Sequence, residues 1–185
     1  MLDRLKKELS PALYYHSIDQ MLDVLDASMR IASLEGLDAY EIELLTTAVY
    51  FHDSGFIYTR QEHEEKGCEI ARSILGEFGY NEEEIDRICG MILATKIPQT
   101  PHNRLEQIIC DADLDYLGRD DFWVIGDKLF RELVHHQILK SAEEWNRIQL
   151  KFIGAHHFFT GSAHKMRQEK KEEHLKAVTE LVESY

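Results

Sequence analysis

The stretch AVYFHDSGFIY, residues 48–58, places an imidazole beside a carboxylate at the end of an apolar helical run. His52 comes four residues after Ala48, so it continues the apolar face of the helix predicted for residues 39–51. Its side chain is therefore expected to point into the protein. A lone histidine in that place is more often a core residue than a ligand. Asp53 directly after it, and the helix-breaking Ser-Gly that follows, favour a site for a divalent metal.

The composition indicates a globular, mainly helical chain. Of its 185 residues, 44% are hydrophobic and 30% charged, which is sufficient for one buried core. Only 10 Gly and 3 Pro leave little material for hairpins or linkers. The formal charge of −13 argues against a nucleic-acid polymer or an anionic membrane as partner. A small phosphorylated substrate remains compatible, because a bound cation can invert the local field.

The cysteines predict a reducing compartment. Cys68, Cys89 and Cys110 are odd in number, dispersed and without a CxxC motif, which is typical of reduced thiols in a cytoplasmic protein. The amphipathic start MLDRLKKELS does not read as a signal peptide, and no apolar run is long enough for a membrane span.

Periodicity and caps predict an all-α chain. A metal-binding helical domain is expected over residues 1–119, with C-terminal helices of residues 120–185 packed on the same domain. Phe78 and Trp123 are expected in the core. Asp115 is expected to be a solvated charge or a helix cap, and the run MRQEKKEEHLK a solvated face. The expected helices cover residues 2–9, 17–34, 39–51, 61–78, 81–94, 103–116, 122–136, 141–158 and a final segment to residue 185. Capping patterns mark three of their starts: Ser17 with Gln20, Asn81 with Glu84, and Ser141 with Glu144.

Other candidate ligands converge on the doublet. His63 extends the buried stripe of its helix backwards by one turn, and His16 stands just before the helix start at Ser17. A surface histidine is the alternative for each. In the helix of residues 103–116, Asp113 projects about 70° from the centre of the apolar face, whereas Asp111 projects about 130° away, nearly outward. Asp113 is therefore the better candidate. Imidazoles with carboxylates suit Mn, Co, Ni, Fe or Zn, and less comfortably Mg.

In this set of residues the chain resembles the HD-domain superfamily of metal-dependent phosphohydrolases. The resemblance rests on YYHSIDQMLDVL, AVYFHDSGF and IICDADLDYLG, whose order H…HD…D spans about residues 14–116. It implies an all-α HD-type bundle with metal ligands at His16, His52, Asp53 and Asp113. The family's late ligand is the Asp of an Ala-Asp pair, which here matches Asp113 and agrees with the helical-face argument.

Departures from the family pattern bear on the number of metal ions and on the acid–base residue. His63 matches a position that helps hold a second ion or the substrate in multi-metal members. Where those members carry a later His-His pair this chain reads ATKIP, which favours one metal per chain. Some members use an acid just after the doublet; here Ser, Gly and Phe follow, and Glu64 or Glu62 is the expected substitute.

The expected activity is hydrolysis of a small phosphate ester, nucleotide-like in kind, by metal-activated water. Asp53 would orient the water, and His63 and Lys96 would stabilise the phosphoryl charge. The alternative is a metal- or nucleotide-binding signalling module that has the same fold but catalyses little. Such a chain, rich in amphipathic helices, is also compatible with a homodimer.

Overall fold

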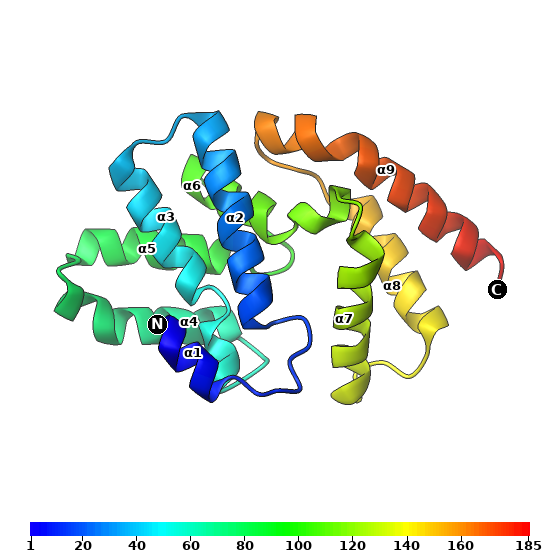
Figure 1. Cartoon of the computed structure of the whole chain (residues 1–185), viewed down its shortest axis with the longest axis horizontal. Helices are drawn as coiled ribbons and strands as arrows, with labels where there is room; N and C mark the ends of the chain where they lie inside the picture. Colours follow the sequence, from blue (N-terminus) through cyan, green and yellow to red (C-terminus); the bar gives the residue numbers. More distant parts are fainter. The chain divides into compact units, whose positions relative to one another are not determined.

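Residues 1–185 are all described by a computed structural model, which contains only helices and loops (Figure 1). The chain divides into two compact units. The N-terminal unit comprises Met1–Ser10 and His16–Asp113, and the C-terminal unit comprises Pro11–Tyr15 and Leu114–Tyr185. The expectation that the C-terminal helices pack on one common domain stays a prediction. No helix combines the length and the apolar character that a membrane span requires.

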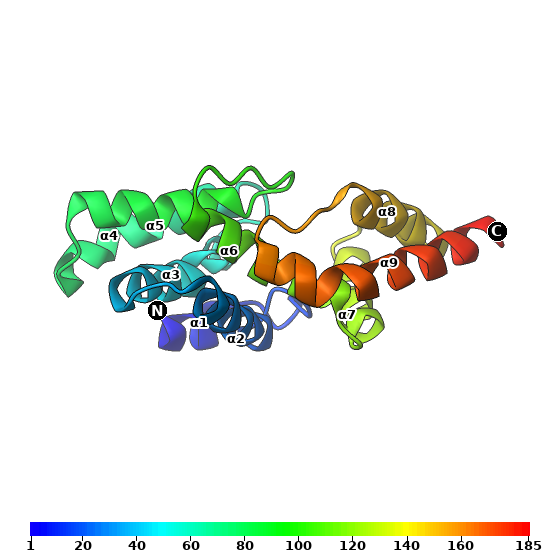
Figure 2. The ribbon, with the colours of Figure 1, turned by 90° about the horizontal axis from the view of Figure 1, so that it is seen from above.

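The N-terminal unit is built around α6. Its helices are α1 (Leu2–Glu8), α2 (Ile18–Glu35), α3 (Ala39–Phe51), α4 (His63–Ile74), α5 (Glu82–Ala94) and α6 (Arg104–Asp113), with short 3-10 turns η1 (Ser54–Ile57) and η2 (Leu75–Phe78). Helices α2, α3 and α5 all pack against α6, and α4 lies beside α5 (Figures 1 and 2). Ile108, Ile109 and Cys110 of α6 are fully buried as a result.

Side-chain caps explain where these helices begin. Ser17 accepts a hydrogen bond from the backbone N–H of Gln20, as its sequence pattern predicts. Asp38 forms a complete capping box at the start of α3, and Asn81 forms the predicted one at the start of α5. Helix α3 then carries the His-Asp doublet at its C-terminal end, where the chain turns into η1.

The C-terminal unit packs three helices and a 3-10 turn around its own core. They are η3 (Asp115–Gly118), α7 (Phe122–His135), α8 (Ala142–Ala155) and α9 (Gly161–Glu183). Helix α9 lies along both α8 and η3. The core cluster consists of Tyr15, Leu114, Tyr116, Leu117, Phe122, Ile153 and Val178.

Several burial predictions were wrong. Asp111, expected to face outward, is fully buried, because α6 is enclosed by three helices and has no outer face. Asp115, expected to be solvated, is also buried and is held by Arg167. Lys171 lies in a run expected to be solvated but is only 4% exposed, because α9 packs along two neighbours. Phe78 and Trp123, expected in the core, are 74% and 45% exposed.

Candidate metal centre

His52 lies at the C-terminal end of α3 with its ring almost completely buried. Its Nδ1 is 2.8 Å from the carbonyl oxygen of Val49. Because a carbonyl can only accept, Nδ1 carries a hydrogen, and Nε2 is the nitrogen that can bind a cation once it gives up its proton. A backbone carbonyl that fixes the tautomer in this way is the usual arrangement behind a metal-binding histidine.

Two carboxylates face that nitrogen. His52 Nε2 lies 3.3 Å from Asp53 Oδ2 and 3.6 Å from Asp113 Oδ1. Asp53 stands where the chain leaves α3 for η1, and Asp113 is the last residue of α6. The side-chain amide of Gln20, in the first turn of α2, donates to Asp113 Oδ1 at 3.1 Å and so orients that carboxylate. The ends of α3 and α6, far apart in sequence, therefore meet at one histidine nitrogen, and α2 orients one of the two carboxylates.

Gly55 allows His63 to join this group. A Cβ on Gly55 would lie 1.9 Å from the backbone oxygen of His63, so only glycine permits η1 and the start of α4 to approach so closely. His63 Nδ1 lies 3.1 Å from the carbonyl oxygen of Arg60, which again leaves Nε2 facing the site. That nitrogen is 3.4 Å from Asp53 Oδ1.

Phe56 separates the rings of His63 and His16. The rings of Phe56 and His16 are stacked, with centroids 4.1 Å apart and planes inclined by 27°. The ring centroids of Phe56 and His63 are 4.0 Å apart. The two imidazoles are 6.2 Å apart between centroids. His16 thus lies at the edge of the group, on the segment just before α2.

The donor set fits a divalent cation chemically. Nε2 of His52 and Oδ2 of Asp53 are buried, and neither makes a hydrogen bond of acceptable geometry although they face each other. Buried polar atoms without partners are rare in folded proteins and often mark a bound ion. Ligands held about 2.0–2.2 Å from one ion at tetrahedral angles lie about 3.3–3.6 Å from each other, close to these separations. As they stand, no three His, Cys, Asp or Glu side chains enclose an ion position.

The charges within the group are strongly coupled. Burial opposes protonation of His52, but the carboxylates of Asp53 and Asp113 outweigh it and raise the pKa of His52 well above its usual value. Burial likewise disfavours ionised Asp53, yet His52, His63 and His16 hold its pKa well below the ordinary range. Asp53 is therefore ionised at neutral pH and is the central negative charge of the group.

The expected catalytic residues differ in their placement. Glu64 is buried in the first turn of α4, with its Oε1 3.4 Å from Nε2 of His63. Glu62 is exposed and adopts a left-handed backbone conformation just before α4. Lys96 is exposed, and its ammonium group pairs with Glu65 rather than with the doublet. Its expected role at a phosphoryl group stays a prediction.

The sequence did not single out three residues that shape this group. Gln20 orients Asp113, Gly55 permits the approach of α4, and Phe56 lies between two histidines. Gly55 and Phe56 come two and three positions after Asp53, and this closeness to the doublet is a signal that could have identified them. Gln20 was recognised only as part of a helix cap, because its contact with Asp113 spans 93 residues.

No protein-family model matches this chain, and no curated protein matches it. Among solved structures, it is similar to the crystal structure of a predicted HD superfamily hydrolase from an uncultured Thermotogales bacterium. The two align with a TM-score of 0.65 and 20% identity, over 99% of this chain and 90% of the other. The prediction of an all-α fold of HD-domain type is thereby confirmed. At this identity the likeness concerns the fold.

Proposed function

We propose that this protein is a metal-dependent phosphohydrolase that hydrolyses a phosphate ester of a small, nucleotide-like molecule. The observation that carries the proposal is that His52 Nε2 and Asp53 Oδ2 lie buried and face each other without a hydrogen bond, beside the carboxylate of Asp113. A site built only for stability would pair such atoms, since a buried polar group without a partner costs about 1–3 kcal/mol.

The residues that would hold the cation are His52, Asp53 and Asp113, with His16 completing the set, and we propose one ion per chain. Mn, Co, Ni, Fe, Zn and Mg are all candidates, since imidazole and carboxylate ligands together do not select one of them. When bound, such a cation supplies Lewis acidity, which lowers the pKa of water towards neutrality and polarises a phosphoryl oxygen.

The side chains around the ion then have separate tasks. Asp53 has one oxygen toward His52 and the other toward His63, so it can orient a water molecule between them. His63 lies between the carboxylates of Asp53 and Glu64, which favour its protonated form. A protonated His63 can donate to a phosphoryl oxygen, and Glu64 can exchange a proton with it. Lys96 would assist only after release from Glu65.

The overall charge supports a small substrate over a large anionic one. At a net charge of −13, a phosphate is repelled except where a cation inverts the field. A nucleic-acid polymer would need a broad basic surface, which this balance of charges disfavours. We place the protein in the cytoplasm because its three cysteines are free and buried. A homodimer stays a prediction.

The second candidate is a metal- or nucleotide-binding signalling module with little catalysis. It is favoured by the absence of an acid immediately after the doublet, where Ser54, Gly55 and Phe56 stand. In that case Glu64 would only be the partner of His63.

One experiment separates these functions. The purified protein is analysed for bound metal and then assayed with an aryl phosphate and a nucleotide panel in added Mn²⁺ or Co²⁺. We expect turnover that His52→Ala and Asp53→Ala abolish together with metal binding, and that the exposed control His157→Ala retains. Stoichiometric metal without turnover on any phosphate would establish the binding module. No metal in the wild-type protein, even after incubation with each ion, would contradict the hydrolase and a metal-binding module, and would leave only a nucleotide-binding module.

A further inference from the structure

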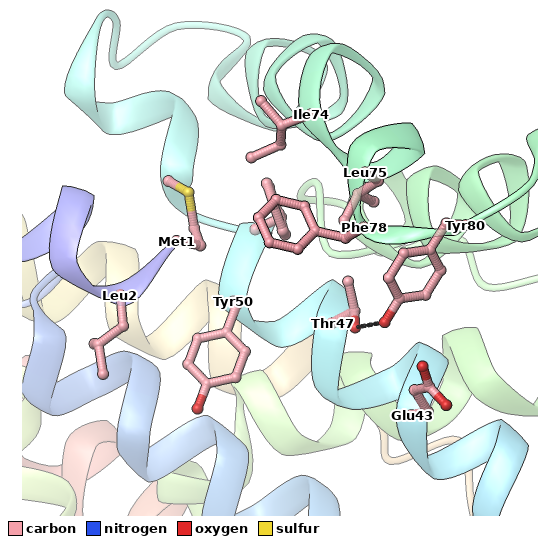
Figure 3. A pocket seen from close by; sticks show the side chains of 10 residues that line it. Met1, Leu2, Glu43, Thr47, Tyr50, Ile74, Leu75, Phe78 and Tyr80 are labelled. Atoms are coloured by element: carbon pink, nitrogen blue, oxygen red, sulfur yellow. Dashed lines mark hydrogen bonds between the residues drawn. The ribbon is translucent and has the colours of Figure 1, made fainter.

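A cavity separate from the candidate metal centre lies in the N-terminal unit, between α1, α3 and the turn η2, with a volume of about 420 Å³ (Figure 3). This volume is within the range of about 300–1,000 Å³ that small-molecule sites occupy. None of the candidate metal ligands lines it. It therefore needs an explanation of its own.

One end of this cavity is polar. Glu43 and Thr47 lie one turn apart on α3, and the hydroxyl groups of Thr47 and Tyr80 are 2.7 Å apart (Figure 3). Burial raises the pKa of Tyr80, and the nearby Glu43 carboxylate adds to this effect, so the phenol stays neutral. No lysine, arginine or histidine forms an ion pair with Glu43. The polar end therefore holds one uncompensated negative charge and two hydroxyl oxygens.

The rest of the lining is apolar and aromatic. It is formed by Met1, Leu2, Tyr50, Phe51, Ile74 and Leu75. Phe78 stands between the two ends in Figure 3, and its side chain is 74% exposed. An aromatic ring in water beside a cavity can gain contact area from an occupant at little entropic cost, since the ring has only two rotatable bonds.

We propose that this cavity binds a small organic ammonium ion. The ammonium group, with three donors and no acceptor, would bond to the Glu43 carboxylate and to the hydroxyl oxygens of Thr47 and Tyr80. Its apolar or aromatic body would pack on Phe78 and Leu75. Glu43 is exposed, so its carboxylate is hydrated when the cavity is empty. An anion is disfavoured by this charge, whereas an ammonium ion gains a charge-assisted hydrogen bond that a neutral ligand lacks. Aromatic faces around the cavity add attraction for a cation.

This proposal does not depend on the proposed hydrolase function. The cavity shares no residue with the candidate metal centre, although Phe51 directly precedes His52. Binding can therefore be measured on metal-free protein, without any assay of turnover.

The test compares three probes of the same shape by calorimetry and by chemical shifts: phenethylamine, 2-phenylethanol and 3-phenylpropionate. We expect the amine to bind most tightly and the carboxylate not at all. Glu43→Gln should weaken amine binding about tenfold, the usual order for loss of a charged hydrogen bond. Glu77→Gln is the matched control, because Glu77 is exposed near the cavity but outside its lining. Phe78→Ala should weaken the amine and the alcohol equally.

Each other outcome points elsewhere. Equal binding of the amine and the alcohol, or unchanged amine binding by Glu43→Gln, would overturn the assignment of a cation. If no probe binds and a dimer of the chain dissociates in Phe78→Ala, a second copy covers this cavity and the proposal is wrong. Loss of amine binding in folded Glu43→Gln with hydrolysis of phosphate esters unchanged would show two independent sites.

Discussion

At the residue scale, the candidate centre depends on backbone contacts as much as on its ligands. Gly55 has no side chain, and its backbone oxygen only accepts hydrogen bonds from the N–H groups of Tyr58 and Thr59. Its place against the backbone of His63 nevertheless brings the start of α4 to Asp53. His63 can therefore join the His52-Asp53 doublet only because a glycine, Gly55, comes two positions after Asp53.

The first prediction concerns Gly55→Ala. The added methyl group would lie 1.9 Å from the oxygen of His63, so the start of α4 must move and His63 with it. We expect Mn²⁺ affinity, measured by calorimetric titration, to fall by about 10–100-fold, as for other losses around metal ligands. Gly76→Ala is the control, because a Cβ there meets nothing within 4 Å. If Gly55→Ala does not fold, His63→Gln tests the same contact; full Mn²⁺ affinity in that variant would contradict the role of His63.

A second prediction at this scale concerns His156. Burial and the nearby Lys171 lower the pKa of His156 from 6.5 to about 3. Between pH 6.5 and about 3, the unfolded chain binds a proton at this imidazole and the folded chain does not. The free energy of unfolding therefore falls as the pH drops below 6.5. The free energy of unfolding falls by at most about 1.4 kcal/mol for each pH unit in this range.

Urea unfolding at pH 6.5 and 5.5 measures this effect. We expect His156→Gln to reduce the loss of stability between the two pH values, since glutamine does not titrate. His164→Gln changes an exposed histidine that is not among the groups shifting His156, and it should leave the loss unchanged. Identical losses in wild type and His156→Gln would show that the imidazole titrates normally.

At the element scale, one buried carboxylate joins η3 to α9. Asp115 accepts two hydrogen bonds from Arg167, at 2.7 and 3.0 Å, and Arg119 approaches it at 3.5 Å. Gly118 permits the contact, because a Cβ there would lie 2.3 Å from the backbone oxygen of Arg167. The C-terminal unit is thus held by an ion pair as well as by its apolar core.

The third prediction is that Asp115→Ala destabilises the C-terminal unit. Removal of the carboxylate leaves Arg167 partly buried without its partner, and we expect a loss of about 3 kcal/mol in the free energy of unfolding. Asp120→Ala removes a 95% exposed carboxylate and should cost less than about 1 kcal/mol. Denaturant titration compares the two variants, and equal effects would mean that the buried pair adds no stability.

At the scale of the whole molecule, the chain consists of two compact units, and every candidate metal ligand belongs to the N-terminal one. A ligand that binds only the folded state stabilises by about 2.7 kcal/mol at a hundredfold excess over its Kd. This stabilisation should be confined to the unit that contains the ligands, unless the two units unfold together.

The fourth prediction follows for hydrogen exchange. Added Mn²⁺ should slow amide exchange in His16–Asp113, with the largest effect in α3, η1 and α6, and should leave α7, α8 and α9 unchanged. The same measurement on Asp53→Ala is the control and should show no response to the ion. Equal protection of α8 and of α3 would indicate either one cooperative molecule or a metal bound elsewhere.

Much of the helical architecture followed from the sequence because its signals are local. Apolar periodicity placed every helix, and side-chain caps placed the starts of α2, α5 and α8. The same periodicity predicted that His52 points inward, which its burial confirms. The helix containing Asp113 ends at that residue and not at residue 116, because the chain turns there into η3.

The sequence by itself therefore determined the all-α class, the helix order and the inward direction of His52, since each depends on residues within about one turn of one another. Only the tertiary structure decided that Asp111, Asp115 and Lys171 are buried, that Phe78 is exposed beside a cavity, and that Gln20 reaches Asp113. The physical reason is that one helix has a predictable apolar face, whereas the number of faces that its neighbours cover depends on packing between residues far apart in the chain.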